Sequence, residues 1–138
     1  MQQGVRLASI LAEIPVLEIR GDAGVQVTGI SYDSRDVRPG HLFVALEGVH
    51  TDGHRFVGDA LQRGATAVLY SRPLDGTRTG ITYARVADTR RALSPVAAAF
   101  HGRPSRRLKV VGITGTDGKS STTWFIHQLL GLAGRKSG

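Results

Sequence analysis

The residues best suited to chemistry lie in one segment, residues 109–123, which reads Lys-Val-Val-Gly-Ile-Thr-Gly-Thr-Asp-Gly-Lys-Ser-Ser-Thr-Thr. An apolar run leads into a glycine-rich loop, and Lys119 and Ser120 then open a helical pattern. Glycines let a backbone approach a ligand closely, and the first turn of a helix offers unpaired N–H groups and the positive end of its dipole. The segment therefore predicts a nucleotide-phosphate loop, in which Lys119 contacts the β- and γ-phosphates and the Ser120 hydroxyl coordinates Mg²⁺.

The glycine spacing of this loop differs from that of a standard P-loop, which has four residues between its first glycine and Gly-Lys. Five residues separate Gly112 from Gly118, and two separate Gly115 from Gly118. A glycine-rich turn between a strand and a helix, with no ligand, is therefore an alternative interpretation. The flanking patterns favour the phosphate loop, because they predict a buried strand over residues 109–114 and a helix over residues 120–133.

Upstream of this loop, the sequence alternates between strand and helix patterns, which is typical of an α/β domain. The predicted strands cover residues 25–32, 42–46, 65–70 and 81–86, and the predicted helices cover residues 6–14, 54–63 and 88–100. Gly64 ends the second helix and Asp88 caps the third, in which Pro95 should bend the helix or delay its start. We therefore expect a compact α/β domain over residues 1–102.

Residues 103–107 contain a proline and several charged residues, and they are predicted to form an interdomain linker. Beyond them, residues 108–138 hold one strand pattern, one loop and one helix pattern. A single unit of this kind cannot cover both faces of a parallel strand. We therefore expect residues 108–138 to be the start of a second domain that is cut short at residue 138.

The composition of the 138 residues fits a globular protein, with 41% hydrophobic residues and no cysteine. The lack of cysteine excludes disulfides and thiolate metal sites, which fits a reducing cytoplasm. No apolar stretch approaches the ~20 residues of a membrane helix, and the N-terminus lacks the pattern of a secretory signal. We therefore expect a soluble, cytoplasmic protein that does not bind a membrane.

The formal net charge of +7 is unevenly distributed. Residues 1–69 carry six Lys or Arg and eight Asp or Glu, whereas residues 70–138 carry twelve and three. A basic half raises the question of nucleic-acid binding. The arginines are scattered and are not interleaved with aromatic residues, which favours a solvated surface or an anionic small molecule over nucleic acid.

Two further clusters have side chains suited to binding. The turn Asp33-Ser34-Arg35-Asp36 offers a hydroxyl and a guanidinium that suit a diphosphate, although a ligand-free Asx-type turn explains it almost as well. His50, Asp52 and His54 have the spacing of metal ligands. No further ligand of suitable spacing accompanies them, and Asp52-Gly53 is typical of a turn entering a helix, so we do not expect a zinc site.

The glycine loop resembles a family motif. Residues 112–122, Gly-Ile-Thr-Gly-Thr-Asp-Gly-Lys-Ser-Ser-Thr, are similar to the ATP loop of the Mur ligase and folylpolyglutamate synthetase superfamily, usually written Gly-x-Thr-Gly-Thr-Asn-Gly-Lys-Thr/Ser-Thr. Asp117 stands where Asn is usual, and its carboxylate would repel phosphates unless Mg²⁺ or a basic neighbour offsets it. The long upstream segment favours a Mur ligase, because folylpolyglutamate synthetase begins near this loop.

The upstream sequence resembles one branch of the Mur ligases. Residues 28–70, which include Ser-Tyr-Asp-Ser-Arg-Asp and Val-His-Thr-Asp-Gly-His-Arg-Phe, look like the N-terminal uridine-nucleotide domain of MurE-like and MurF-like ligases. The junction over residues 101–112, with its Pro-Ser pair, is closer to the MurE-like branch. The resemblance implies a small α/β uridine-nucleotide-binding domain followed by the first strand, P-loop and helix of a P-loop ATPase domain.

The resemblance also implies site residues. The UDP-linked substrate would be bound by Tyr32, which replaces a more usual aliphatic residue, and by Ser34, Arg35, Val49, His50 and Thr51. ATP would be bound by Gly115, Thr116, Asp117, Gly118, Lys119, Ser120 and Ser121. Lys119 would have the catalytic role, and Ser120 would hold the metal.

The activity that the resemblance implies is ATP-dependent ligation of the third amino acid to UDP-N-acetylmuramoyl-L-alanyl-D-glutamate, a step of peptidoglycan precursor synthesis that uses ATP and Mg²⁺. A MurF-like ligase that adds a dipeptide is the first alternative, although its ATP loop more often carries Ser-Ser-Gly-Lys. A non-catalytic UDP-sugar-binding module becomes the better interpretation if the natural chain ends at Gly138. We expect a monomer whose partners are the UDP-linked dipeptide and an amino acid, without nucleic acid.

Overall fold

A computed structural model describes residues 4–48 and 51–138 of the chain. The chain divides into two compact units, Met1–Pro104 and Ser105–Gly138. The boundary between them falls inside the predicted linker, residues 103–107.

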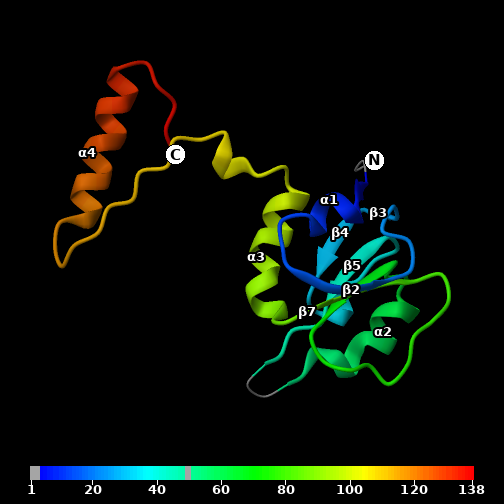
Figure 1. The fold of residues 1–138 in the computed structure, drawn as a ribbon. Helices are drawn as coiled ribbons and strands as arrows, with labels where there is room; N and C mark the ends of the chain where they lie inside the picture. The colour runs from blue at the N-terminus through cyan, green and yellow to red at the C-terminus, as the bar shows by residue number, and fades with distance from the viewer. Residues whose placement is uncertain (1–3, 49–50) are drawn as a thin grey trace. The chain divides into compact units, whose positions relative to one another are not determined.

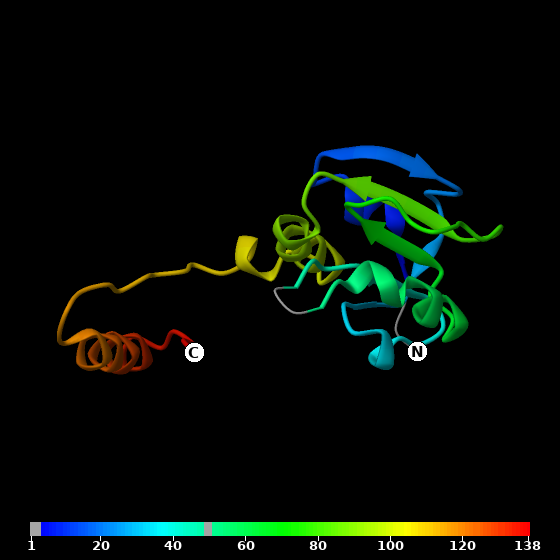
Figure 2. The ribbon, with the colours of Figure 1, turned by 90° about the horizontal axis from the view of Figure 1, so that it is seen from below.

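The first unit is built on a five-stranded sheet with the strand order β2-β7-β6-β5-β4 (Figure 1). Its strands are Val16–Arg20 (β2), Gly29–Ser31 (β4), His41–Val44 (β5), Ala67–Tyr70 (β6) and Thr82–Val86 (β7). β4, β5, β6 and β7 are parallel, whereas β2 runs antiparallel to β7, as Figure 2 shows. The carboxyl ends of the four parallel strands therefore lie along the same edge of the sheet.

Helices pack on both faces of this sheet. α1 (Leu7–Leu11) and α3 (Thr89–Phe100) share a core with one face, and α2 (Val57–Gln62) shares a core with the other. A short antiparallel pair, β1 (Val5–Arg6) with β3 (Gln26–Val27), lies beside the main sheet. Within the described residues, no helix is both long enough and apolar enough to cross a membrane.

The middle strands are apolar throughout because both of their faces are covered. Leu42 and Val44 of β5 pack in the core with α1 and α3, whereas Phe43 between them packs in the core with α2. All three side chains have no exposed surface. Successive residues of a strand point to opposite faces, so a strand buried on both sides has no polar position. The prediction of a buried strand over residues 42–46 is confirmed.

Two predicted elements differ in their bounds. The strand predicted over residues 25–32 is divided into β3 and β4, since the intervening Thr28 N–H donates to the carbonyl of Gly40 (2.9 Å). The helix predicted over residues 54–63 begins as a 3₁₀ turn, Gly53–Phe56, before α2.

The N-terminal region holds two strands that the sequence did not reveal, the two-residue β1 and the longer β2. The helix predicted over residues 6–14 is limited to α1, and the chain then enters β2, an edge strand. Glu18 and Arg20 interrupt the apolar pattern of β2, and Leu17 is 58% exposed. Backbone pairing with β7 forms this strand. An edge strand that buries few side chains has only a weak sequence signal, so the sequence pattern did not predict it.

Pro95 does not delay the start of α3, contrary to one of the two predicted effects. The helix begins at Thr89, and the Asp88 carboxylate caps it by accepting a hydrogen bond from the backbone N–H of Arg91 (3.0 Å). The Thr89 hydroxyl donates to the carbonyl of Ala45 (2.8 Å), which joins the start of α3 to the end of β5. The predicted cap is confirmed.

The second unit contains one long helix, α4 (Lys119–Leu132), which matches the helix predicted over residues 120–133. The strand predicted over residues 109–114 is wrong, because this segment has no regular structure. Val110 is 74% exposed and Val111 is 70% exposed. A strand needs a neighbour to pair its backbone groups, and no strand within the described residues pairs with this segment.

Gly64 provides a test of the turn between α2 and β6. Its φ is +98°, and a Cβ added there would lie 2.9 Å from the Cα of Pro39. We expect Gly64→Ala to lower the free energy of unfolding by about 1–3 kcal/mol, measured by urea denaturation. Gly58→Ala is the control, since nothing lies within 4 Å of its added Cβ in α2 and alanine should stabilise the helix by about 0.5–1 kcal/mol. Equal effects of the two substitutions would contradict this account of the turn.

Candidate functional site

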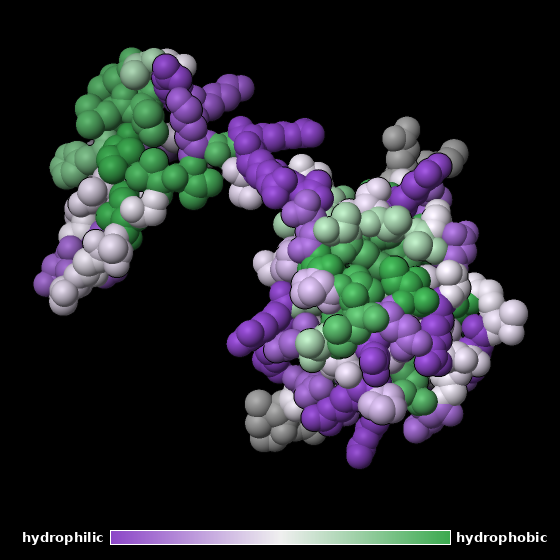
Figure 3. Space-filling view, in the orientation of Figure 1, coloured by the Kyte–Doolittle hydropathy of each residue, from purple (hydrophilic) through white to green (hydrophobic). Residues whose placement is uncertain are grey.

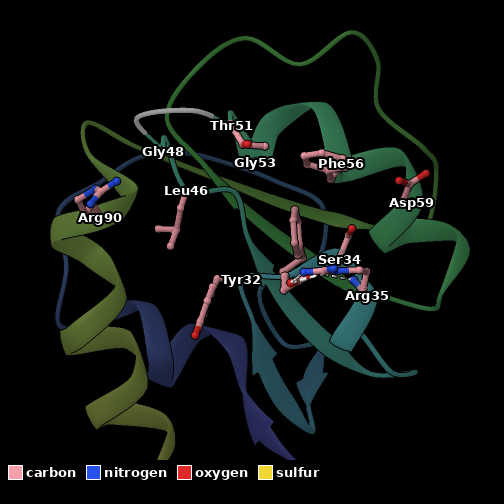
Figure 4. A pocket seen from close by; sticks show the side chains of 12 residues that line it. Tyr32, Ser34, Arg35, Leu46, Gly48, Thr51, Gly53, Phe56, Asp59 and Arg90 are labelled. Carbon is pink, nitrogen blue, oxygen red and sulfur yellow. Dashed lines mark hydrogen bonds and ion pairs between the residues drawn. The ribbon is translucent and has the colours of Figure 1, made fainter.

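A pocket of about 670 Å³ opens at the carboxyl edge of the sheet (Figure 4). Its walls come from the loops after β4 and β5, from the start of α2, and from the first turn of α3. Open α/β sheets bind their ligands at this edge. The lining residues are Tyr32, Asp33, Ser34, Arg35, Phe43, Leu46, Gly48, Thr51, Gly53, Phe56, Asp59 and Arg90.

Asp33 holds the turn that follows β4. Its Oδ1 accepts a hydrogen bond from the backbone N–H of Arg35 (2.9 Å), and its Oδ2 lies 2.6 Å from Arg35 Nη2. The side-chain hydrogen bond from Arg35, supported by the backbone one, lowers the pKa of the Asp33 carboxyl to about 2. The structure therefore contains the Asx-type turn and also places Ser34 and Arg35 in the pocket.

The side chains of this turn differ in burial. Ser34 is 8% exposed, and its hydroxyl has no hydrogen-bond partner among the described residues. Tyr32, which precedes the turn, is 64% exposed. A hydroxyl that lines a pocket without a partner is available to a ligand.

The loop that follows β5 folds back on itself as a narrow hairpin. The backbone N–H of Gly48 donates to the carbonyl of Thr51 (2.9 Å), and that of Gly53 donates to the carbonyl of Leu46 (2.8 Å). All four residues line the pocket. The described residues of the hairpin therefore form part of the pocket wall.

His54 holds the base of this hairpin. Its Nδ1 lies 2.6 Å from Asp52 Oδ1, and its Nε2 accepts hydrogen bonds from the backbone N–H groups of Ser71 (3.0 Å) and Arg72 (3.2 Å). Because Nε2 accepts two hydrogen bonds, the ring proton is on Nδ1 and is donated to Asp52. The side chain of His54 is only 7% exposed. The imidazole therefore joins the loop after β5 to the chain that follows β6.

Arg72 completes this network through ion pairs. Its Nε lies 2.8 Å from Glu47 Oε1, and its Nη1 lies 3.5 Å from Asp52 Oδ2. Hydrogen bonds from His54, with Arg72 a smaller influence, lower the pKa of Asp52. Within residues 4–48 and 51–138, no group of three His, Cys, Asp or Glu side chains is arranged to hold a metal ion. Asp52 and His54, the described residues of the His/Asp cluster, therefore form a structural clamp that joins the loop after β5 to the chain after β6.

The pocket brings together most of the residues predicted to bind the UDP-linked substrate. Val49 and His50 lie outside the described residues. The other four, which come from two separate loops, line one cavity: Tyr32, Ser34, Arg35 and Thr51.

The sequence analysis missed the pocket residues that helices and buried strands contribute. Phe56 has only the sequence pattern of a helix core position, and Arg90 is one of the scattered arginines whose pattern favours either a solvated surface or an anionic small molecule. Asp59 lies on α2 and gave no signal of its own. These residues reach the pocket only through the packing of α2 and α3 against the sheet.

In the second unit, the glycine loop leads directly into α4. Gly118 precedes the helix with a φ of +75°, a conformation that favours glycine. Lys119 Nζ donates to the carbonyls of Gly115 (2.5 Å) and Thr116 (3.2 Å), so its ammonium group lies over the loop. Several groups in the described chain therefore fit a phosphate and its metal ion chemically. They are the backbone N–H groups that open α4, the Ser120 hydroxyl and the Lys119 ammonium group.

Comparison with known proteins identifies the family. The sequence profile described as "Mur ligase family, catalytic domain" matches residues 26–101, which is more than half of the chain. The chain belongs to the Mur ligase family. The matched residues include every described part of the pocket and end before the glycine loop.

Curated relatives of this Mur ligase chain include two that match it over more than nine tenths of its length. A protein of Treponema pallidum named UDP-N-acetylmuramyl-tripeptide synthetase is 49% identical over 128 residues, 93% of this chain and 24% of the relative. A protein of Alkaliphilus metalliredigens named UDP-N-acetylmuramoyl-L-alanyl-D-glutamate–2,6-diaminopimelate ligase is 40% identical over 134 residues, 97% of this chain and 27% of the relative. The chain therefore spans about a quarter of the length of these relatives.

Solved structures of Mur ligases share the fold. A crystal structure of MurF from Acinetobacter baumannii has a TM-score of 0.70 at 26% identity, over 95% of this chain and 28% of that one. MurF from Thermotoga maritima, solved in complex with ADP, has a TM-score of 0.54 at 30% identity, over 74% of this chain and 23% of that one.

The His54 clamp can be tested by its effect on stability. His54→Ala removes a buried acceptor from two backbone N–H groups and a donor from Asp52, so we expect the free energy of unfolding to fall by about 1–3 kcal/mol in urea. His127→Ala is the matched control, because the His127 side chain is exposed and its one hydrogen-bond partner among the described residues is the Ser137 hydroxyl. If both substitutions change stability equally, His54 does not hold the hairpin.

Proposed function

We propose that the chain contributes the substrate-binding domain and the start of the ATP-binding domain of an ATP-dependent ligase. The reaction would add the third amino acid to UDP-N-acetylmuramoyl-L-alanyl-D-glutamate in peptidoglycan precursor synthesis. The observation that supports this most directly is the pocket, which collects Ser34, Arg35 and Thr51 at the edge of the sheet where α/β proteins bind ligands.

The names of the relatives support the tripeptide branch. The relatives that are 49% and 40% identical are named as ligases of the third residue or as tripeptide synthetases, whereas the MurF structures are 26% and 30% identical. A MurF-like ligase that adds a dipeptide is the second candidate, because its solved structures share this fold. The two candidates can be distinguished by which substrate they bind, the UDP-linked dipeptide or the UDP-linked tripeptide, which differ by one amino acid.

The proposed chemistry has two steps. A terminal carboxylate oxygen of the UDP-linked dipeptide attacks the γ-phosphorus of ATP, which forms an acyl phosphate and releases ADP. The amino nitrogen of the incoming amino acid then attacks the acyl carbon, so that an amide forms, phosphate leaves and the nitrogen loses a proton. The ADP in the Thermotoga maritima MurF structure supports a nucleotide in this fold.

The two units would divide this work. The pocket of the first unit would hold the uridine nucleotide and so position the peptide end of the substrate. In the second unit, the Lys119 ammonium group would exchange the carbonyls of Gly115 and Thr116 for phosphate oxygens. Mg²⁺, held in part by the Ser120 hydroxyl, would supply positive charge beside the phosphates.

Ser34 gives a direct test of the substrate assignment. Titration of UDP-N-acetylmuramoyl-L-alanyl-D-glutamate into the 138-residue chain should give saturable heat, and Ser34→Ala should weaken binding roughly fivefold by removing one hydrogen bond. Ser94→Ala, an exposed change on α3, should leave the affinity unchanged. Absence of saturable heat in the parent chain would refute the substrate assignment, and unchanged affinity in Ser34→Ala would refute the role of Ser34.

Lys119 tests the phosphate loop in the whole ligase. Lys119→Ala should lower kcat by about 100-fold or more with little effect on the fold, because one charged contact to the transferring phosphoryl group is lost. Lys136→Ala, which removes an exposed positive charge beyond α4, is the control. Near-normal turnover of Lys119→Ala at saturating ATP would remove this loop from the mechanism.

A further inference from the structure

The pocket has two unlike ends. Figure 4 shows Ser34, Arg35 and Asp59 at one side and Arg90 at the other, beside the hairpin that carries Gly48. Between these ends lie the side chains of Leu46 and Tyr32. Each end has one arginine, so both could receive an anionic group.

The end that contains Arg35 has little free positive charge. The Arg35 guanidinium is engaged by the Asp33 carboxylate, with Nη2 to Oδ2 at 2.6 Å and Nε to Oδ1 at 3.0 Å. Asp59 adds a second carboxylate to the same side of the pocket. Arg63 lies beside this end, where it donates to the backbone carbonyl of Arg35 (3.5 Å). The residues that line the pocket at this end are nevertheless one arginine and two carboxylates, so the lining itself has no excess positive charge for a diphosphate.

The end that contains Arg90 has a positive charge that no carboxylate offsets. Arg90 Nη2 donates to the backbone carbonyl of Glu47 (2.5 Å), and this neutral acceptor is its single hydrogen-bond partner among the described residues. The Glu47 carboxylate is itself occupied by Arg72 Nη2 (2.9 Å) and by the Ser71 hydroxyl (3.1 Å). The guanidinium keeps its charge and most of its five N–H donors.

The two ends also differ in their apolar surface. Phe56, which is 37% exposed, lies at the end with Ser34 and Asp59. A planar nucleobase stacks on aromatic rings and offers polar edges to a hydroxyl and a carboxylate. This end therefore suits the base of a nucleotide better than its phosphates.

We infer that Arg90, and not Arg35, is the arginine that binds the diphosphate of the UDP-linked substrate, with the uracil base directed toward the Ser34 and Asp59 end. The inference rests on the proposed function, because it assigns an orientation to that ligand. Arg90 then has two roles: one N–H holds the carbonyl of Glu47 at the base of the hairpin, and the remaining donors bind phosphate oxygens as charge-assisted hydrogen bonds.

The test compares a charged and a neutral ligand on the 138-residue chain. UDP and uridine are titrated into the parent chain, Arg90→Gln, Arg90→Lys and Arg35→Gln, and the ratio of the two affinities is measured. Arg90→Gln should weaken UDP binding by about tenfold or more, with uridine affinity unchanged within about twofold. Arg90→Lys should recover part of the loss, whereas Arg35→Gln should leave the ratio unchanged.

Arg91→Gln is the matched control, since Arg91 is the next residue of α3, is 91% exposed in its side chain and pairs with Asp88 at the surface. It should change neither affinity. If Arg90→Gln weakens uridine and UDP by the same factor, Arg90 acts only through the hairpin and the inference is wrong. It is also wrong if Arg35→Gln, and not Arg90→Gln, lowers the ratio. The proposed function survives both results, but it fails together with the inference if the parent chain binds neither UDP nor the UDP-linked dipeptide.

Discussion

The parallel pairing of β4, β5, β6 and β7 is the constraint on which the first unit depends. A parallel strand must be followed by a connection that returns to the opposite edge, so the loops that leave these four strands begin at the same side. The turn after β4, the hairpin after β5, the segment after β6 and the first turn of α3 consequently gather at one edge. The pocket and the His54 clamp are both made from these segments.

Most charged groups at this edge are already paired, and this pairing gives the pocket its chemical character. Asp33 is occupied by Arg35, and Glu47 and Asp52 are occupied by Arg72. Fixed pairs of this kind hold loop backbones in place without leaving a strong net field. The Ser34 hydroxyl and the Arg90 guanidinium have no charged or hydrogen-bonding side-chain partner among the described residues, so both are available for polar interactions with a ligand.

In the second unit, the element with local hydrogen bonds forms, whereas the element that needs a neighbouring strand does not. Its helix α4 forms as expected, because helical hydrogen bonds are local and need no neighbouring strand. The apolar segment that precedes the glycine loop does not form a strand, and Leu108, Val110 and Val111 are exposed. The loop itself is nevertheless shaped at its junction with α4, where Gly118 and Lys119 set the first turn.

Sequence alone determined the elements with local signals: the buried apolar run of β5, the Asp88 cap of α3, the Gly64 turn after α2, and the helix that follows Gly118. It also indicated Ser34, Arg35 and Thr51 as pocket residues through a family resemblance. Tertiary structure decided which distant segments meet. β2 exists only as a partner of β7, His54 is a clamp only because Ser71 and Arg72 lie beside it, and Arg90 reaches the pocket only through the position of α3. The physical reason is that hydrogen bonds within a helix or turn are encoded by neighbours in sequence, whereas the pairing of charges across loops depends on where the sheet places them.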